Sequence, residues 1–350
     1  TAKKFTIDAS TTNAIHRQFE QMYLRRDKNF GNAREARRLF DSAVEKQSQR
    51  LMKQMSDPNF NQEDMFKIVE DDLADGRNEQ ARPLDEVLSE LDEFVGMRSV
   101  KNMIRRLAVQ SMFMKQRAAM GAGKVQQMSM NFILMGNPGT GKTTIARKMG
   151  EVLQSMEILP TSHVVEVSRA TLVGKYMGET PKIVNNMCDK AMGGILFIDE
   201  AYTLSAENDQ YGKEAIDTLM KRMEDDRGKF VVIAAGYKDQ MENFLMANPG
   251  LASRFTHKMQ IDDYNEDELQ AIFKKMAQKD NYTLSPAAEF KLMDLICRKV
   301  VSKDQNFGNA REMRNLLDAT IQQLSVRVSG MQEVTKETYQ TIMPEDICDV

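Results

Sequence analysis

Eight consecutive residues of this chain combine the residue types that bind the phosphates of a nucleotide. They read Gly136-Asn137-Pro138-Gly139-Thr140-Gly141-Lys142-Thr143. Glycines let backbone N–H groups close around phosphate oxygens, and a helix that follows directs its positive end toward them. In this pattern Lys142 reaches the β and γ phosphates and the Thr143 hydroxyl binds Mg²⁺. The spacing therefore predicts a site for a nucleoside triphosphate.

The residues on either side supply the strand and the helix that such a loop requires. Residues 131–135 form an apolar run typical of a buried strand. Apolar residues then recur at helical spacing, at Ile145, Met149, Val152, Leu153 and Met156. A chance glycine-rich turn would lack this context. We expect residues 136–144, the last being Thr144, to hold ATP.

A second apolar run, residues 193–198, ends in Asp199-Glu200. An Asp at the carboxyl end of a parallel strand can hold Mg²⁺ through its water shell, and an adjacent Glu can polarise an attacking water. Two acids after a strand are, taken alone, also typical of a solvated strand end. Together with the upstream loop they predict the second half of an ATPase site.

Composition limits the partners and the compartment. The 350 residues carry a formal net charge of −3, which gives no general attraction to nucleic acid or to an anionic membrane. The arginines at 25, 26, 34, 37 and 38 are interspersed with acids, so they predict a solvated helix face. No apolar stretch has the length of a membrane span or a signal peptide. We expect a cytoplasmic protein, with an organelle stroma as the alternative, and neither nucleic acid nor membrane as its partner.

Part of the chain is repeated. Residues 29–35, Asn-Phe-Gly-Asn-Ala-Arg-Glu, return as residues 306–312, an offset of 277 residues (306 − 29). At this offset the agreement extends from Thr6 with Thr283 to Arg50 with Arg327. Apolar positions correspond as well, so both copies predict the same helical subdomain.

These patterns together resemble an AAA+ ATPase of the CbxX/CfqX family, which includes red-type Rubisco activases and stage V sporulation K-like proteins. The resemblance runs from about Leu84 to the end of the chain. Its most specific stretches are residues 136–143, 172–180, 191–202, 235–244 and 248–255. It implies a hexameric ring that hydrolyses ATP and remodels a protein substrate, as a chaperone does.

The resemblance also implies roles for three further residues. Arg254 resembles an arginine finger that serves the ATP of a neighbouring subunit, where such fingers raise the rate by roughly 10³ to 10⁵. Its alternative is a surface arginine at a strand entry. Arg311 resembles the second sensor, with an ion pair to an acid such as Asp318 as the alternative. Tyr237 stands where AAA+ proteins carry a polar first sensor, and we include it in the nucleotide site without assigning it chemistry.

Tyr176 lies in a glycine-flanked loop, Gly174-Lys175-Tyr176-Met177-Gly178. An aromatic residue between glycines is unusual for a core position. The resemblance implies a pore loop in which Tyr176 and Met177 grip an extended polypeptide, because an aromatic ring offers a large, sequence-tolerant contact. The alternative is a tyrosine that packs back on its own domain.

The expected fold is α/β, with four parts. Residues 1–52 resemble the helical lid of a preceding AAA+ unit, 53–83 form a partly helical linker, 84–262 form the parallel αβα nucleotide-binding domain, and 263–350 form a helical lid. The first segment is expected to pack on the αβα domain through Ile15, Phe19, Leu39 and Val44. Two other functions stay open: a nucleotide-gated assembly scaffold, and a nucleic-acid motor or loader.

Overall fold

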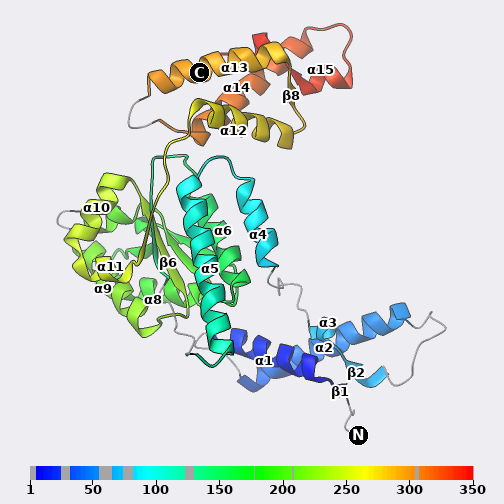
Figure 1. Cartoon of the computed structure of the whole chain (residues 1–350), viewed down its shortest axis with the longest axis vertical. Coiled ribbons are helices and arrows are strands. Elements are labelled where there is room, and N and C mark those ends of the chain that lie inside the picture. Colours follow the sequence, from blue (N-terminus) through cyan, green and yellow to red (C-terminus); the bar gives the residue numbers. More distant parts are fainter. Residues whose placement is uncertain are drawn as a thin grey trace.

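The computed structural model describes residues 5–24, 32–54, 65–73, 82–122, 130–176, 178–206, 209–303 and 307–349. They form three bodies that follow one another along the long axis of Figure 1: an N-terminal helical unit, a central αβα domain and a C-terminal helical lid. The lid and the N-terminal unit each have one cluster of buried apolar side chains, and the central domain has two.

Five parallel strands form the central sheet, in the order β4-β5-β6-β3-β7. Their bounds are Phe132–Met135 (β3), Val164–Val167 (β4), Ile195–Ile198 (β5), Val231–Gly236 (β6) and His257–Gln260 (β7). The three inner strands are buried at every position, which explains why they are continuous apolar runs rather than alternating ones. The predicted parallel αβα fold is confirmed.

Helices cover both faces of this sheet. One face is covered by α8 (Thr180–Ala191), α9 (Gln210–Asp225), α10 (Lys238–Ala247) and α11 (Pro249–Arg254), with the short α7 (Arg169–Leu172) beside them. The other face is covered by α4 (Leu84–Asp92), α5 (Arg98–Ala119) and α6 (Lys142–Ser155). The sheet is therefore a buried layer whose carboxyl edge is left for a site.

The lid begins after β7. It consists of α12 (Glu266–Lys279), β8 (Thr283–Leu284), α13 (Pro286–Val301), α14 (Ala310–Ser329), α15 (Lys336–Gln340), β9 (Thr341–Ile342) and the 3-10 turn η3 (Pro344–Asp346). Strands β8 and β9 pair in parallel. Helix α12 begins sharply because the Asn265 side chain accepts from the Glu268 N–H at 2.8 Å while the Glu268 carboxylate accepts from the Asn265 N–H at 3.1 Å.

The N-terminal unit consists of β1 (Thr6–Ile7), α1 (Ala9–Leu24), α2 (Asn32–Gln54), β2 (Lys67–Ile68) and α3 (Glu70–Leu73), and β1 pairs in parallel with β2. It repeats a buried ion pair of the lid. Arg50 donates to both carboxylate oxygens of Asp72 at 2.9 Å and to the Lys67 carbonyl at 3.0 Å. Arg327 does the same with Asp346, at 2.7 and 2.8 Å, and with the Thr341 carbonyl at 3.0 Å. Residues 65–73, expected in the linker, therefore pack with α1 and α2.

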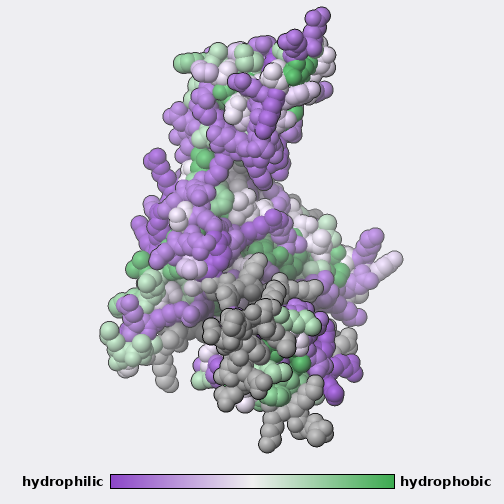
Figure 2. All heavy atoms as spheres, turned by 90° about the vertical axis from the view of Figure 1, so that its right-hand side faces the viewer, coloured by the Kyte–Doolittle hydropathy of each residue, from purple (hydrophilic) through white to green (hydrophobic). Residues whose placement is uncertain are grey.

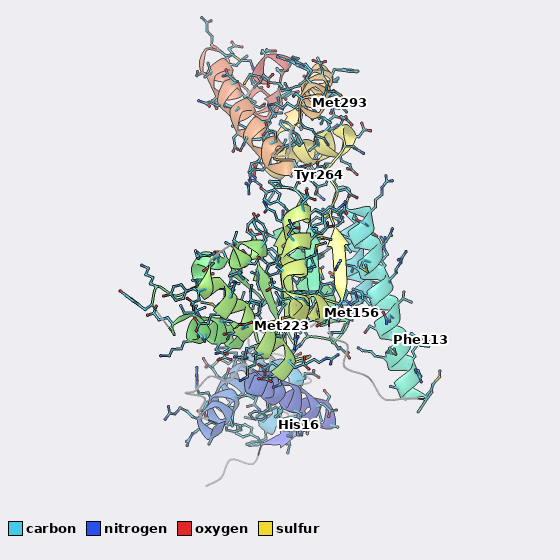
Figure 3. All side chains as sticks on the ribbon, turned by 90° about the vertical axis from the view of Figure 1, so that its left-hand side faces the viewer. His16, Phe113, Met156, Met223, Tyr264 and Met293 are labelled. Atoms are coloured by element: carbon cyan, nitrogen blue, oxygen red, sulfur yellow. The ribbon has the colours of Figure 1, made fainter. Side chains whose placement is uncertain are left out.

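Of the four residues expected to pack this unit on the αβα domain, Ile15 and Val44 pack against the apolar cluster of the unit itself. Its apolar cluster consists of Ala14, Ala43, Ile68 and Leu73, flanked by Phe5, Ile15 and Val44, all from within residues 5–73. Leu39 is buried as well, but Phe19 is exposed. Figure 3 shows His16 in this N-terminal unit, directly below the central domain in that view.

In the part of the chain that the structure describes, no helix is both long enough and hydrophobic enough to span a membrane. Figure 2 shows a mainly hydrophilic face over the lid, with apolar side chains in smaller patches below it.

Candidate functional site: a nucleotide loop closed by the lid

The glycine-rich loop lies where the sequence predicts it, between the carboxyl end of β3 and the first residue of α6. Gly141 precedes the helix with a positive φ of 91° and, as a glycine, offers no side chain to cap the first N–H groups of α6. These N–H groups, with the positive end of the helix dipole, are the donors that suit a phosphate. Thr143 is half-buried and Thr144 exposed on the first turn of the helix.

The Lys142 side chain is buried and folds back over the loop. Its Nζ donates to the Gly136 carbonyl at 2.9 Å and to the Asn137 carbonyl at 3.0 Å, and it lies 5.8 Å from the centre of the Tyr237 ring. Burial lowers the pKa of Lys142, while the charges of Glu200 and Asp199 act in the opposite direction. The predicted lysine and the two predicted acids are therefore close enough to interact.

The acidic pair follows β5 at the same edge of the sheet as the loop. The Asp199 N–H donates to the Val167 carbonyl at 2.9 Å, and the Asp199 carboxylate accepts from the Glu200 N–H at 3.1 Å. Glu200 has a positive φ of 51°, so the chain turns sharply just after the strand. The Tyr202 phenol donates a hydrogen bond to the Glu200 carboxylate.

Tyr237 lies beside Lys142 of the loop, and Tyr202 lies beside Glu200. Their ring centroids are 6.2 Å apart. Gly236 must stay without a side chain here, because a Cβ on it would lie 2.8 Å from Cδ1 of Tyr202. Its carbonyl accepts from the Gly136 N–H at 3.1 Å, which ties β6 to the first residue of the loop. Tyr237, at the position predicted for the first sensor, therefore faces the site with its aromatic ring.

The lid closes directly onto the loop. Asn309, which is fully buried, donates from its side-chain amide to the Pro138 carbonyl at 3.2 Å and to Asp263 at 2.9 Å, and accepts from the Tyr264 N–H at 3.1 Å. The Ala310 N–H donates to the Gly139 carbonyl at 3.2 Å. Figure 3 places Tyr264 at this junction of lid and central domain.

Two further contacts join the lid to the loop. Together with the contacts of Asn309 and Ala310 they form what we call the clasp. Asp263 accepts from the Asn137 side-chain amide at 3.0 and 3.1 Å, and the Tyr264 phenol donates to the Thr140 carbonyl at 3.1 Å. Gly139, with a φ of 70°, lies so close to the lid that a Cβ on it would be 1.9 Å from the Gly308 carbonyl oxygen. Only glycine fits at that position while the lid is closed.

Arg311 follows the clasp at the start of α14, and its charge is close enough to Lys142 to help lower the pKa of the lysine. Its side chain is exposed, and among the described residues it makes no ion pair with Asp318, the alternative considered from the sequence. The structure therefore brings Arg311 to the same site as Lys142, Asp199 and Glu200.

Arg254 and Tyr176 lie elsewhere. Arg254 ends α11, just before β7, and β7 runs parallel to β3 with His257 opposite Phe132. It therefore lies at the amino edge of the sheet, while the phosphate loop follows the carboxyl end of β3, roughly 13 Å of strand away. Arg254 Nη1 donates to the Gly250 carbonyl at 3.0 Å and Nη2 lies 3.4 Å from Glu224, whereas Nε is buried and has no hydrogen-bond partner among the residues that the structure describes.

The Tyr176 side chain is 71% exposed, so it does not pack back on its own domain. Its loop is held by Glu179, whose carboxylate accepts from the N–H groups of Lys175 and Tyr176, both at 3.1 Å. Met177, predicted as its companion, is outside the described residues.

Sequence reasoning missed three members of the site: Tyr202, Asp263 and Asn309. A signal existed for Asn309, because it belongs to the repeated Gly-Asn-Ala-Arg stretch. Asp263 stands at the predicted domain boundary and Tyr202 within a stretch that carries the family resemblance, but neither has a local pattern that indicates its partner.

Comparisons with known proteins agree with this geometry. A family model described as the AAA lid domain matches residues 1–83 and 265–349, and one described as the ATPase family associated with various cellular activities (AAA) matches residues 132–263. The stage V sporulation protein K of Bacillus subtilis is 39% identical over 266 residues, which cover 75% of this chain and 82% of that protein.

Two further relatives extend the comparison. The CfxQ protein of Xanthobacter flavus is 42% identical over 69% of this chain and 77% of its own length. The chloroplastic ribulose bisphosphate carboxylase/oxygenase activase of Cyanidioschyzon merolae is 38% identical over 75% of this chain and 91% of its own length. The chain is thus an ATPase of the AAA+ class and belongs to the CbxX/CfqX family.

Proposed function

We propose that this ATPase uses the hydrolysis of ATP to remodel a protein substrate, which it grips with Tyr176 in the pore of a ring. The observation that carries the proposal is the exposed Tyr176, held on a loop organised by Glu179, in a chain whose nucleotide loop and acids lie elsewhere. One relative is named as an activase of an enzyme, which supports a protein as the substrate class.

At the nucleotide, the N–H groups of the loop from Gly136 to Thr144 and the Lys142 ammonium would bind the phosphates. The Thr143 hydroxyl and Asp199 would hold Mg²⁺, which neutralises charge on the β and γ phosphates when it is bound. Few ligands are needed from the chain, because Mg²⁺ keeps several waters and takes phosphate oxygens. Glu200 would accept the proton of the attacking water.

The position of Arg254 supports the proposal of a ring. Because it lies at the amino edge of the sheet, it cannot serve the phosphate loop of its own chain, whereas a neighbouring copy placed head to tail could receive it. The Arg254 side chain is 29% exposed, which supports access of a neighbouring copy to its guanidinium. We propose a homo-oligomer with one such contact per site, a hexamer as the family resemblance implies. Arg311 would contact the nucleotide of its own chain.

The other two functions are testable in the same assay. A scaffold would bind ATP with little turnover, and a nucleic-acid motor would be stimulated by single-stranded DNA. We expect the basal ATPase of the chain to rise with an unstructured polypeptide and to be unaffected by single-stranded DNA.

The decisive experiment fuses an unstructured polypeptide to a folded fluorescent protein and follows the loss of fluorescence with ATP. We expect Tyr176→Ala to keep basal ATPase within a few-fold of the wild type while abolishing this loss. Tyr339→Ala, which truncates an exposed tyrosine of the lid, is the matched control and should remodel normally. Normal remodelling by Tyr176→Ala would overturn the proposed grip, and loss of ATP binding in that variant would make Tyr176 structural.

A further inference from the structure

An ion pair joins the segment that follows the acidic pair after β5 to the segment that precedes the Tyr176 loop. The 3-10 turn η2 (Ala201–Ser205) begins directly after Glu200, and Asp209 lies between η2 and α9. Helix α7 follows β4 and ends shortly before the Tyr176 loop. Arg169 is the first residue of α7. Its Nε donates to one carboxylate oxygen of Asp209 at 2.8 Å, and its Nη2 lies 2.7 Å from the same oxygen.

The two carboxylate oxygens of Asp209 have separate partners. Oδ2 accepts from Arg169, whereas Oδ1 accepts from the Gly212 N–H at 3.0 Å and so caps the first turn of α9. The Asp209 side chain is only 9% exposed, and the hydrogen bond from Arg169 is the largest of the effects that lower its pKa. Asp209 is therefore ionised at neutral pH and fixes Arg169 to the beginning of α9.

Asp209 is closely connected to the turn that carries Glu200. The Glu200 carbonyl accepts from the Thr203 N–H at 2.9 Å and from the Thr203 hydroxyl at 2.6 Å, which fixes η2 to Glu200. A Cβ on Gly212 would lie 2.2 Å from the Leu204 carbonyl oxygen, so the first turn of α9 lies directly against η2. Because packed backbone segments deform little, a displacement of η2 also displaces the start of α9, where Asp209 lies.

Arg169 is connected as closely to the Tyr176 loop. Helix α7 is only four residues long, so its first residue lies seven positions before Tyr176 (176 − 169). After this helix the Gly174 N–H donates to the hydroxyl of Thr180, which is fully buried, at 3.1 Å. The Tyr176 loop is therefore attached to α7 at one end and to α8 at the other. Arg169 in turn ties α7 to Asp209.

The ion pair contributes little to the stability of the fold. The Arg169 side chain is 43% exposed, and water and salt screen an ion pair with such a partner. The caps of α7 and α9 do not use the guanidinium, so they stay in place without it. The position of the pair, between the acids and the Tyr176 loop, therefore indicates a role in how these two segments move together.

From this we infer that Arg169 and Asp209 are positioning residues, which couple a polypeptide held at Tyr176 to the acids that hydrolyse ATP. This coupling rests on the proposed grip of Tyr176 and gives that grip control over turnover. A polypeptide that pulls on Tyr176 shifts α7, and the ion pair carries the shift to η2 and so to Glu200. Because coupling between two binding sites is reciprocal, the bound nucleotide also changes the affinity for the polypeptide through the same pair.

The test measures the ATPase rate with a saturating unstructured polypeptide, divided by the basal rate of the same variant. Arg169→Gln and Asp209→Asn should each lose most of the stimulation. Asparagine keeps the cap of α9, because it caps as well as aspartate does. The double variant should lose no more than either single variant, since the two residues act as one pair. Arg147→Gln is the matched control, because it removes the same Nε and Nη2 contacts with Glu166 of β4, and it should keep the wild-type ratio.

A binding measurement on the same variants does not depend on turnover. In the Glu200→Gln background, a labelled polypeptide should bind with affinities that differ about fivefold or more between ATP and ADP. Arg169→Gln and Asp209→Asn should each bring these two affinities together. Circular dichroism melts show whether each variant is folded.

The outcomes separate this inference from the proposed function. Wild-type stimulation and full nucleotide dependence in both Arg169→Gln and Asp209→Asn would overturn the inference and leave the grip of Tyr176 intact. An equal loss of stimulation in Arg147→Gln would also overturn it, because the effect would then be one of surface charge. An unaltered chain that neither binds the polypeptide nor responds to it would overturn the proposed function, and this inference with it.

Discussion

The Tyr202 phenol donates a hydrogen bond to the Glu200 carboxylate, the group that we propose as the base for the attacking water. Burial raises the pKa of Tyr202 above its usual range, and the bond to Glu200 adds to this effect. The phenol therefore stays protonated at neutral pH and remains a donor. Because it engages one carboxylate oxygen, the other oxygen is left for the nucleophile, and Tyr202 is a positioning residue.

Tyr202→Phe should lower kcat about fivefold, because it removes a hydrogen bond worth about 1 kcal/mol that orients the base. KM for ATP should stay within twofold, because this hydrogen bond acts on the base alone. Glu200→Gln, in contrast, should retain ATP affinity and lose most turnover. Steady-state kinetics with nucleotide-binding titrations separate the two variants. A rise in KM with unchanged kcat in Tyr202→Phe would show that the phenol acts on binding instead.

The clasp between lid and loop predicts that Asn309 controls how long the nucleotide stays bound. Its removal leaves the buried Tyr264 N–H without a partner, at a cost of about 1–3 kcal/mol to the closed state. Asn309→Gly should therefore increase the dissociation rate of a fluorescent nucleotide by about tenfold.

The backbone at Asn309 provides the control. Its φ of 46° suits glycine, so Asn309→Gly removes the amide without strain, whereas Asn309→Ala adds strain to the same loss. Nucleotide dissociation should be faster in the alanine variant than in the glycine variant. Equal, wild-type rates in both would show that the clasp does not hold the lid closed.

The extent to which sequence predicts this site depends on how local each contact is. The loop from Gly136 to Thr143 could be predicted because all its donors lie within eight residues and the flanking strand and helix repeat the expected periodicity. Asp263 and Asn309 meet across 46 residues, and no local pattern records that contact. The residue spacing in the repeat identified α1 and α2 correctly, but β2 has only two residues and no periodicity to find.

The contact between α4 and α6 predicts a pH dependence of stability. Arg82, followed by Lys148, holds the pKa of Glu90 down from 4.5 to about 2. Since the folded-state pKa is depressed, this stabilisation is present above about pH 4.5 and is lost as the pH falls toward 2. Glu90 is partly exposed, so the effect is modest.

Glu90→Gln should therefore lower the unfolding temperature at pH 7, and its difference from the wild type should shrink as the pH falls through this window. Circular dichroism melts at several pH values measure the difference. Glu93→Gln, at a more exposed acid nearby, should show no such convergence. A constant difference between Glu90→Gln and the wild type across the window would disprove the assignment.

The central claim is that Arg254 completes the nucleotide site of a neighbouring chain. The most direct measurement mixes two inactive variants, Arg254→Ala, which keeps its phosphate loop, and Lys142→Ala, which keeps its arginine. In random rings about one site in four then combines an intact loop with an intact finger, so ATPase activity should return to roughly a quarter of the wild type. Mixing Lys142→Ala with Glu200→Gln should restore nothing, because neither chain can hydrolyse ATP. No recovery in the first mixture, with both variants folded and assembled, would contradict the account.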